Sequence, residues 1–542
     1  MIGVVVQTGD EVVVREFFEL FKTPWEFARL GGRYDVLLCN QSEIPDVSAS
    51  LVLCFGCDEL TVAAGEPPAI LAQQSGARIR SEAGELPIYG GCLTFRGEAV
   101  AGLVEISRCE AAAVASCAAG SNIVRLGFDL FAEVRHLLTS GQPAASAAIP
   151  ALDLHIALLR QLITAAGLPL VEIPPVPAGH PFMACLTHDV DHPILRNHRF
   201  DHTLAGFLYR STFGSLVAVA RGRLDLQRLI QNWGAALSLP LVHCGLARDI
   251  WRDSLMAYAG LEHGLGATFF VIPFKGRPGR PFNGTVSPRR AAPYEPSEIG
   301  DELRRLIASG CEVGVHGLDA WCDSVGGGVE RDQIADVTGV SELGVRMHWL
   351  WFDERSPAAL EQAGFSYDST VGFNQTVGFR AGTTQAYRPL NATHLLELPL
   401  HVMDTALFYP SYLDLSPAEA RSLVGTLLDQ AVTFGGALTV NWHDRSIAPE
   451  RLWGGFYFWL LQNLKARQAW FPTASQAVAW FRHRRSVVFE SVSWDAGTLK
   501  LRTSSAAAGE GPALQLRVHR PGGGREKFVD LPYQSGELAI AV

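Results

Sequence analysis

The sequence contains no run of residues that is long and apolar enough to cross a membrane. Its richest window, Leu204 to Ala220, is interrupted by Arg210, so it falls short of the about 18 uncharged residues that a spanning helix needs. The first residues, Met1 to Glu11, lack the basic start, the apolar core and the small-residue cleavage pattern of a secretory signal. We therefore expect a soluble, cytoplasmic protein without membrane insertion.

An excess of basic residues and a patterned set of cysteines are also missing. The formal net charge is −10, and this acidity disfavours nonspecific binding to nucleic acid or to an anionic membrane surface. The 10 cysteines are irregularly spaced, and the one close pair, Cys54 and Cys57, has no second pair near it. We expect no nucleic-acid partner, no disulfide framework, and a packing role for the cysteines.

Apolar residues are plentiful, at 48% of 542, which is enough for the cores of two or three domains. Residues 1–150 mix short β-like runs with helical stretches, which predicts an N-terminal α/β accessory domain. An amphipathic helix and a stiff, proline-rich linker are expected at 151–178. Alternating segments between glycine turns predict a small β-rich C-terminal domain at 486–542.

Residues 179–485 alternate short apolar runs with longer helical segments. This pattern is typical of parallel strands joined by crossover helices, and it predicts an α/β fold built on a distorted (β/α) barrel. An insertion at about 196–246 is expected to form helices over one face. The predicted strands are Phe182–Thr187, Ala267–Ile272, Glu312–His316, Gly344–His348, His394–Leu400 and Ala437–His443.

Polar side chains recur at the ends of these predicted strands. Because successive side chains of a strand point to opposite faces, Asp189 and Asp191 share one face. In a barrel of parallel strands the catalytic site lies at the carboxyl ends of the strands. Taken singly, a strand-end aspartate often caps a helix and a lone histidine is often structural. Four strands together nevertheless predict one site made of Asp189, Asp191, His316, Arg346, His348 and His443.

These stretches resemble the polysaccharide deacetylase family, which is also called the NodB-homology or carbohydrate esterase family four fold. The resemblance covers about Phe182 to Phe481. Arg346 falls where the family places the arginine of its third motif. The other matching segments are Leu186–Asp191, Gly266–Val271, Glu312–Asp319, Ala358–Ser369 and Trp442–His443.

The resemblance implies a hydrolase of non-peptide amide bonds that removes N-acetyl groups from a glycan or a glycan precursor. It implies a divalent metal, usually zinc with cobalt or nickel as alternatives, held by one aspartate and two histidines. By position, Asp191 and His316 would be metal ligands, Asp189 the general base and His443 the general acid. Arg346 would orient Asp189. The implied setting is bacterial carbohydrate metabolism.

The sequence departs from the family at the second metal histidine, because Ala320 stands four residues after His316. Among the possible replacements His348 is slightly preferred, since the alternation of its strand turns it inward. The alternatives are Asp319, Cys322, Asp323 and His188. If none of them binds the metal, the chain would be a catalytically degenerate carbohydrate-binding or scaffold protein.

Further polar residues stand near the predicted strand ends. His188, Arg380 and Asp404 are candidates for contacts with the substrate, and for the last two an ion pair that supports the barrel mouth is an equal alternative. A hydrolase of non-sugar amides is the competing enzymatic hypothesis, because one fold hosts many chemistries and a missing ligand can mark a different substrate.

Overall fold

The computed structural model describes residues 1–41, 47–56, 68–118, 121–222, 224–448, 450–451, 453–495, 497–506, 509, 511–521 and 528–541. Cys57, one half of the close cysteine pair, lies outside these residues. Among the described residues, no helix combines the length and the apolar character that a membrane span requires.

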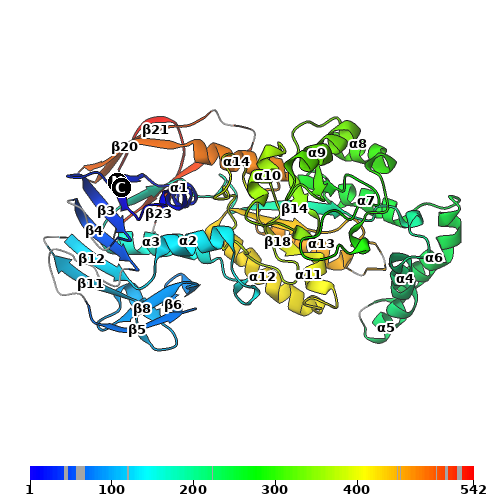
Figure 1. Cartoon of the computed structure of the whole chain (residues 1–542), viewed down its shortest axis with the longest axis horizontal. Helices are drawn as coiled ribbons and strands as arrows, with labels where there is room; N and C mark the ends of the chain where they lie inside the picture. Colours follow the sequence, from blue (N-terminus) through cyan, green and yellow to red (C-terminus); the bar gives the residue numbers. More distant parts are fainter. Residues whose placement is uncertain are drawn as a thin grey trace.

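A curled sheet of six parallel strands forms the centre of the larger part of the molecule (Figure 1). Its spatial order is β17-β16-β15-β14-β19-β18. The predicted distorted barrel of an α/β fold is thereby confirmed. The strands are β14 (Met183–Val190), β15 (Ala267–Val271), β16 (Glu312–Gly317), β17 (Val345–Met347), β18 (Leu400–Met403) and β19 (Ala437–Asn441).

The strand expected at His394–Leu400 is wrong, because β18 starts only at Leu400. Pro399 lies within the expected segment, and proline has no N–H to give to a ladder. The gap between β17 and β18 is instead spanned by isolated bridges, in which Asp368 pairs with Val345 on one side and with Glu397 on the other. The barrel is therefore closed by irregular backbone along this seam.

Helices cover the outer face of the sheet, where the outward-facing side chains of the strands are apolar. Leu186, Phe269, Val315 and Val440 belong to one fully buried core that these helices complete. The covering helices are α7 (Ile250–Leu261), α8 (Gly300–Ala308), α9 (Ser324–Thr338), α10 (Ser356–Gln362), α12 (Pro417–Phe434) and α13 (Gly454–Ala466). A further helix, α14 (Ala474–Ser486), packs in a second buried cluster with Met183, Cys185 and Phe270.

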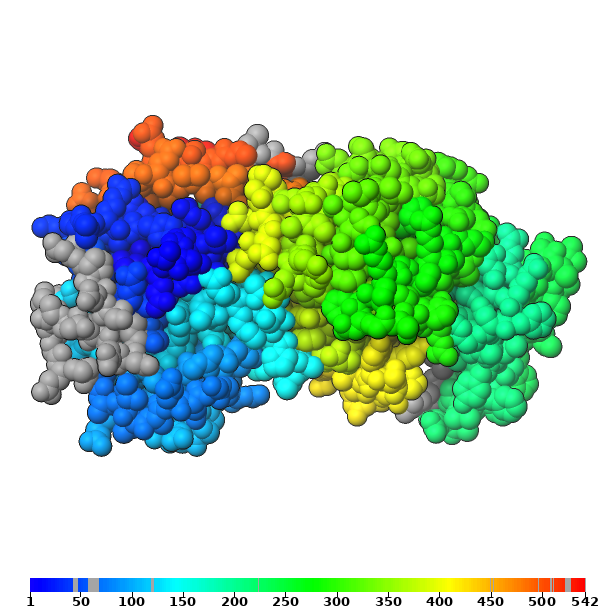
Figure 2. Space-filling model, viewed as in Figure 1, coloured from blue at the N-terminus to red at the C-terminus, as the bar shows by residue number. Residues whose placement is uncertain are grey.

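The insertion after β14 is helical and forms a separate lobe beyond the barrel, at the right of Figure 1 and Figure 2. It comprises α4 (His202–Tyr209), a π-helical turn (Arg210–Gly214), α5 (Ser215–Ala220) and α6 (Leu226–His243).

The N-terminal part holds two further six-stranded sheets with α1 (Glu11–Leu20), α2 (Leu130–Thr139) and α3 (Ala151–Ala165). The first sheet contains β1 (Ile2–Val5), β2 (Trp25–Phe27), β3 (Arg33–Cys39), β4 (Ser48–Phe55), β11 (Ala113–Ala118) and β12 (Ser121–Leu126). The second contains β5 (Ile70–Ser75), β6 (Arg78–Ser81), β7 (Gly84–Pro87), β8 (Gly91–Phe95), β9 (Val104–Glu105) and β10 (Glu110–Ala111).

The C-terminal strands lie beside the N-terminal sheets, at the left of Figure 1. A three-stranded antiparallel sheet contains β20 (Val488–Asp495), β21 (Thr498–Ser504) and β24 (Gly536–Ala541). Of the other two, β22 (Gln515–His519) pairs with β13 (Leu170–Glu172) on one side and with β23 (Phe528–Pro532) on the other. Part of the segment expected as a linker is thus a strand, and it joins residues from the two ends of the chain.

Candidate active site

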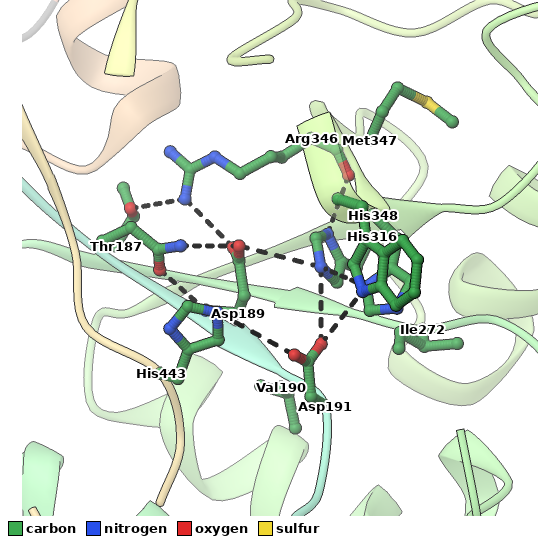
Figure 3. Close-up of polar contacts among 12 residues, drawn as sticks. Thr187, Asp189, Val190, Asp191, Ile272, His316, Arg346, Met347, His348 and His443 are labelled. Atoms are coloured by element: carbon green, nitrogen blue, oxygen red, sulfur yellow. Dashed lines mark hydrogen bonds and ion pairs between the residues drawn. The ribbon is translucent and has the colours of Figure 1, made fainter. Parts of the chain in front are cut away.

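Asp191, His316 and His348 meet at the carboxyl end of the parallel sheet (Figure 3). Oδ1 of Asp191 lies 3.4 Å from Nε2 of His316 and 3.4 Å from Nδ1 of His348. The two ring nitrogens lie 2.9 Å from each other. Zinc bonds of about 2.0–2.1 Å in a tetrahedron separate neighbouring ligand atoms by roughly 3.3 Å. The three atoms are therefore spaced as one metal ion would require.

Each donor atom of this triad can also present a lone pair to such an ion. Oδ1 of Asp191 is buried and makes no hydrogen bond to any described residue. Nδ1 of His316 pairs with the backbone carbonyl oxygen of Arg346 at 2.9 Å, which assigns the proton to Nδ1 and leaves a lone pair on Nε2. Burial lowers the pKa of His348 to about 4 in spite of Asp191, so at neutral pH this imidazole is neutral, as a ligand must be.

The loop that carries His348 is held in an unusual conformation. Trp349 and Leu350 have positive φ angles of 65° and 53°, which non-glycine residues rarely adopt. Arg290 is fully buried and donates to the carbonyl oxygen of His348 at 3.0 Å and to that of Leu318, just beyond β16, at 3.1 Å. The guanidinium of Arg290 therefore joins the loop that follows β16 to the loop that follows β17.

Ala320 points away from this site. It is fully buried against α9, and a methyl group added to Gly327 would lie 2.9 Å from its Cβ. An imidazole at position 320 would displace that helix. Two other alternative ligands are engaged elsewhere, since Asp323 accepts from the N–H of Gly326 at the start of α9 and Asp319 accepts from the N–H of Arg280.

Asp189 lies beside the triad, 3.7 Å from Nε2 of His316, and it is held from two sides. Nη1 of Arg346 donates to its Oδ1 at 3.0 Å, and Nδ2 of Asn441 donates to its Oδ2 at 2.6 Å. Burial alone would raise the pKa of Asp189, but His316, Arg346 and His443 outweigh it and lower that pKa. Asp189 is therefore a carboxylate with a fixed orientation.

Arg346 is fully buried and is fixed by further bonds. Its Nη1 donates to Oγ1 of Thr187 at 2.7 Å, and its Nη2 donates to Oγ of Ser369 at 2.9 Å. Its guanidinium also lies over the ring of Phe270, 4.5 Å from the centroid. The planar fork thus bonds both to β14 and to the irregular segment after β17, which a lysine ammonium could not reproduce.

His443 faces the triad from the segment just after β19, with its Nε2 3.8 Å from Oδ2 of Asp191. Its Nδ1 donates to Oδ1 of Asp404 at 2.6 Å, and its backbone N–H donates to Oδ2 at 2.8 Å. Burial lowers the pKa of His443, but the carboxylates of Asp404, Asp191 and Asp189 outweigh burial and raise it to about 10. The ring is thus an imidazolium whose free N–H points into the site.

None of the three residues expected to contact the substrate lines the cavity beside the triad. His188 is fully buried on the opposite face of β14, where it contacts Glu262 and Tyr258. Arg380 lines a separate cavity next to α2 and donates to the carbonyl oxygen of Gly372. Asp404 is fully buried and positions His443 instead of facing the cavity.

Two positioning residues were not proposed from the sequence. Asn441 could have been found, because strand alternation places it on the same face as His443. Arg290 gives no such signal, since it lies in a short 3-10 helix (Pro288–Arg290) far along the chain from the loops that it joins.

The site opens into a cavity of about 420 Å³. Its wall contains Asp189, Asp191, His316, His348 and His443, together with aromatic and basic side chains from the insertion and from the segment after β19.

No protein-family model and no curated protein matches the chain. Solved structures that resemble it include a protein of Mycobacterium smegmatis described as a polysaccharide deacetylase, with 19% identity over 57% of this chain and 95% of that chain and a TM-score of 0.35. A Pseudomonas aeruginosa PAO1 protein of the same description has 16% identity over 60% and 97%, with a TM-score of 0.34. The Puue allantoinase has 16% identity over 57% and 93%, with a TM-score of 0.35. At these identities and TM-scores, the chemistry has to be argued from the residues of the site.

Proposed function

We propose that this protein is a metal-dependent hydrolase that removes N-acetyl groups from a glycan or a glycan precursor. The observation that carries the proposal is the Asp191, His316 and His348 triad, whose donor atoms lie 2.9–3.4 Å apart beside a buried carboxylate and an imidazolium. A cytoplasmic, bacterial setting belongs to the same proposal and rests on the family that the sequence resembles.

The residues of the site could supply the three groups that amide hydrolysis needs, which are a metal ion, a general base and a general acid. A divalent ion, most simply zinc, would be held by Asp191, His316 and His348, and it would polarise the acetyl carbonyl and acidify the attacking water. Asp189 is ionised and fixed, so it accepts the proton of that water as the general base. His443 carries a proton on Nε2 and donates it to the leaving amine nitrogen.

Two buried residues hold these groups in their reactive states. Arg346 fixes the carboxylate of Asp189 and stabilises its charge, while Asp404 fixes the ring of His443 and stabilises its protonated form. The base and the acid therefore have opposite charges within one cavity, so that one can take a proton from water while the other gives a proton to the leaving nitrogen.

The test combines metal content with acetate release. Wild-type protein, Asp191→Ala and His316→Ala are compared by elemental analysis and by acetate release from N-acetylated oligosaccharides, with the exposed His263→Ala as the matched control. We expect one metal per chain in the wild type and the control, and loss of metal and activity in the other two. A wild type that binds no zinc, cobalt or nickel and releases no acetate would favour a degenerate binding protein. If the wild type binds a metal but hydrolyses only non-sugar amides, the competing hypothesis of a hydrolase of non-sugar amides would be favoured.

A further inference from the structure

Four arginines line the same cavity as the metal triad, and three of them, Arg210, Arg445 and Arg451, each have a buried side-chain nitrogen without a hydrogen bond to any described residue. Arg210 comes from the π-helical turn of the insertion, and Arg445 and Arg451 come from the segment after β19. Nε of Arg210, Nη1 of Arg445 and Nε of Arg451 are buried atoms without a hydrogen bond to any residue that the structure describes.

Two acidic residues next to these arginines in the chain are engaged with other groups. Asp444 accepts from the backbone N–H of His192 and of Arg445, each at 2.9 Å. Glu450 accepts from the indole N–H of Trp251 at 3.0 Å. The positive charge of the guanidinium groups is thus not matched by an ion pair within the described part of the wall.

Two of the three arginines lie against aromatic rings. The guanidinium of Arg445 lies 4.9 Å from the ring centroid of Trp251, and that of Arg451 lies 5.1 Å from that of Trp453. Burial and the nearby charge of Arg451 together lower the pKa of Arg445 to about 9. Buried donors and mutually repelling cations are costly unless an anion completes them.

We infer that Arg210, Arg445 and Arg451 form a subsite for a phosphate group carried by the N-acetylated sugar. Guanidinium groups are the side chains best suited to bind phosphate oxygens, because their planar N–H donors match the spacing of the oxygens. The inference rests on the proposed function, and it narrows the substrate to an N-acetylated sugar phosphate. Because triad and arginines share one cavity of about 420 Å³, one sugar phosphate could reach both.

The phosphate could belong to a soluble sugar phosphate or to a lipid carrier. Residues 202–248, which include the helices beside this wall, contain five arginines and one aspartate in a chain whose net charge is −10. The same helices expose large apolar side chains, among them Phe213, Ile230 and Leu237. Both sources of the phosphate are therefore tested.

The experiment measures binding by calorimetry, which needs no turnover. The probes are N-acetylglucosamine, N-acetylglucosamine 1-phosphate, inorganic phosphate, and N-acetylglucosamine linked through phosphate to a short prenyl chain in detergent. The variants are Arg445→Gln/Arg451→Gln and the single variant Arg451→Gln. The matched control is Arg29→Gln/Arg355→Gln, which removes two exposed arginines.

We expect a phosphorylated sugar to bind the wild type and the control about tenfold or more tightly than the neutral sugar, with the difference lost in the double variant and reduced in the single one. Unchanged metal content and unfolding temperature would show that the variants fold. The phosphorylated sugar that binds more tightly identifies the source of the phosphate.

Equal binding of neutral and phosphorylated sugars to the wild type would overturn the inference even if acetate is released. Equal losses in the control and in the double variant would do the same. A third result would separate the two proposals. If phosphate binding depends on the arginines but the protein releases no acetate, the proposed deacetylase function would be contradicted and the anion subsite would stand.

Discussion

Nε2 of His316 lies 2.9 Å from Nδ1 of His348, and both nitrogens face Oδ1 of Asp191 (Figure 3). Two imidazole nitrogens at this distance would ordinarily form a hydrogen bond, with the proton on one of them. Here Nδ1 of His316 already pairs with a backbone carbonyl oxygen and His348 has a low pKa, so a cation that accepts both lone pairs fits the pair better.

The first prediction concerns the identity of the third metal ligand, which we assign to His348. His348→Ala should lose the metal and the activity, because one of the three donors is removed. Adding Ala320→His to this variant should not restore either, since Ala320 packs against Gly327 of α9 and not toward the triad. Metal content by elemental analysis checks both steps. Recovery of metal in the double variant would show that position 320 can reach the site.

The second prediction concerns the general base. Arg346→Lys keeps the charge but loses the bonds to Thr187 and Ser369, so the pKa of Asp189 should rise. The acidic limb of the kcat/KM profile should therefore move to higher pH, and the rate at neutral pH should fall by about a hundredfold. An acidic limb at the wild-type position would mean that Arg346 supports only the fold.

The third prediction concerns His443. Its pKa of about 10 depends on Asp404, so Asp404→Asn should lower that pKa toward the ordinary histidine value. Histidine resonances of the metal-free protein, followed by NMR as the pH is raised, measure this directly. In the wild type the ring should lose its proton near pH 10, and in the variant at a clearly lower pH. Identical titrations would exclude Asp404 as the cause.

The fourth prediction concerns stability in acid. Glu172 is buried and accepts from Arg160 and from His519, and although burial alone would raise its pKa, these partners hold it well below the usual range. Because its pKa in the folded state is depressed, its contribution is fully present above the unfolded pKa of about 4.3 and is lost as pH falls toward the folded value.

Glu172→Gln should therefore lower the free energy of unfolding by about 3 kcal/mol at pH 7 and by progressively less below pH 4. Denaturant unfolding at several pH values measures the difference, with the exposed Glu537→Gln as the control. A difference that does not change with pH would show that packing of Glu172, and not its charge, provides the stability.

Much of the barrel could be predicted from the sequence, because β14, β15, β16 and β19 are apolar segments flanked by helical patterns. The alternation along these strands also predicted the face of Asp189 and His443. Three other placements depend on contacts between residues far apart in the chain, which no local pattern encodes. They are the buried side of His188, the partner of Asp404 and the bridging position of Arg290.

The pairing of β13 with β22 determines when, during synthesis, the edge of β13 can be covered. Glu172 and His519 are 347 residues apart, and the whole barrel is made between them. On the ribosome the N-terminal sheets and the barrel can therefore fold while β13 still lacks its neighbour. A chain that stops before β22 would expose the edge of β13 and leave Glu172 with fewer partners. The edge of β13 is therefore covered only after β22 has been synthesised.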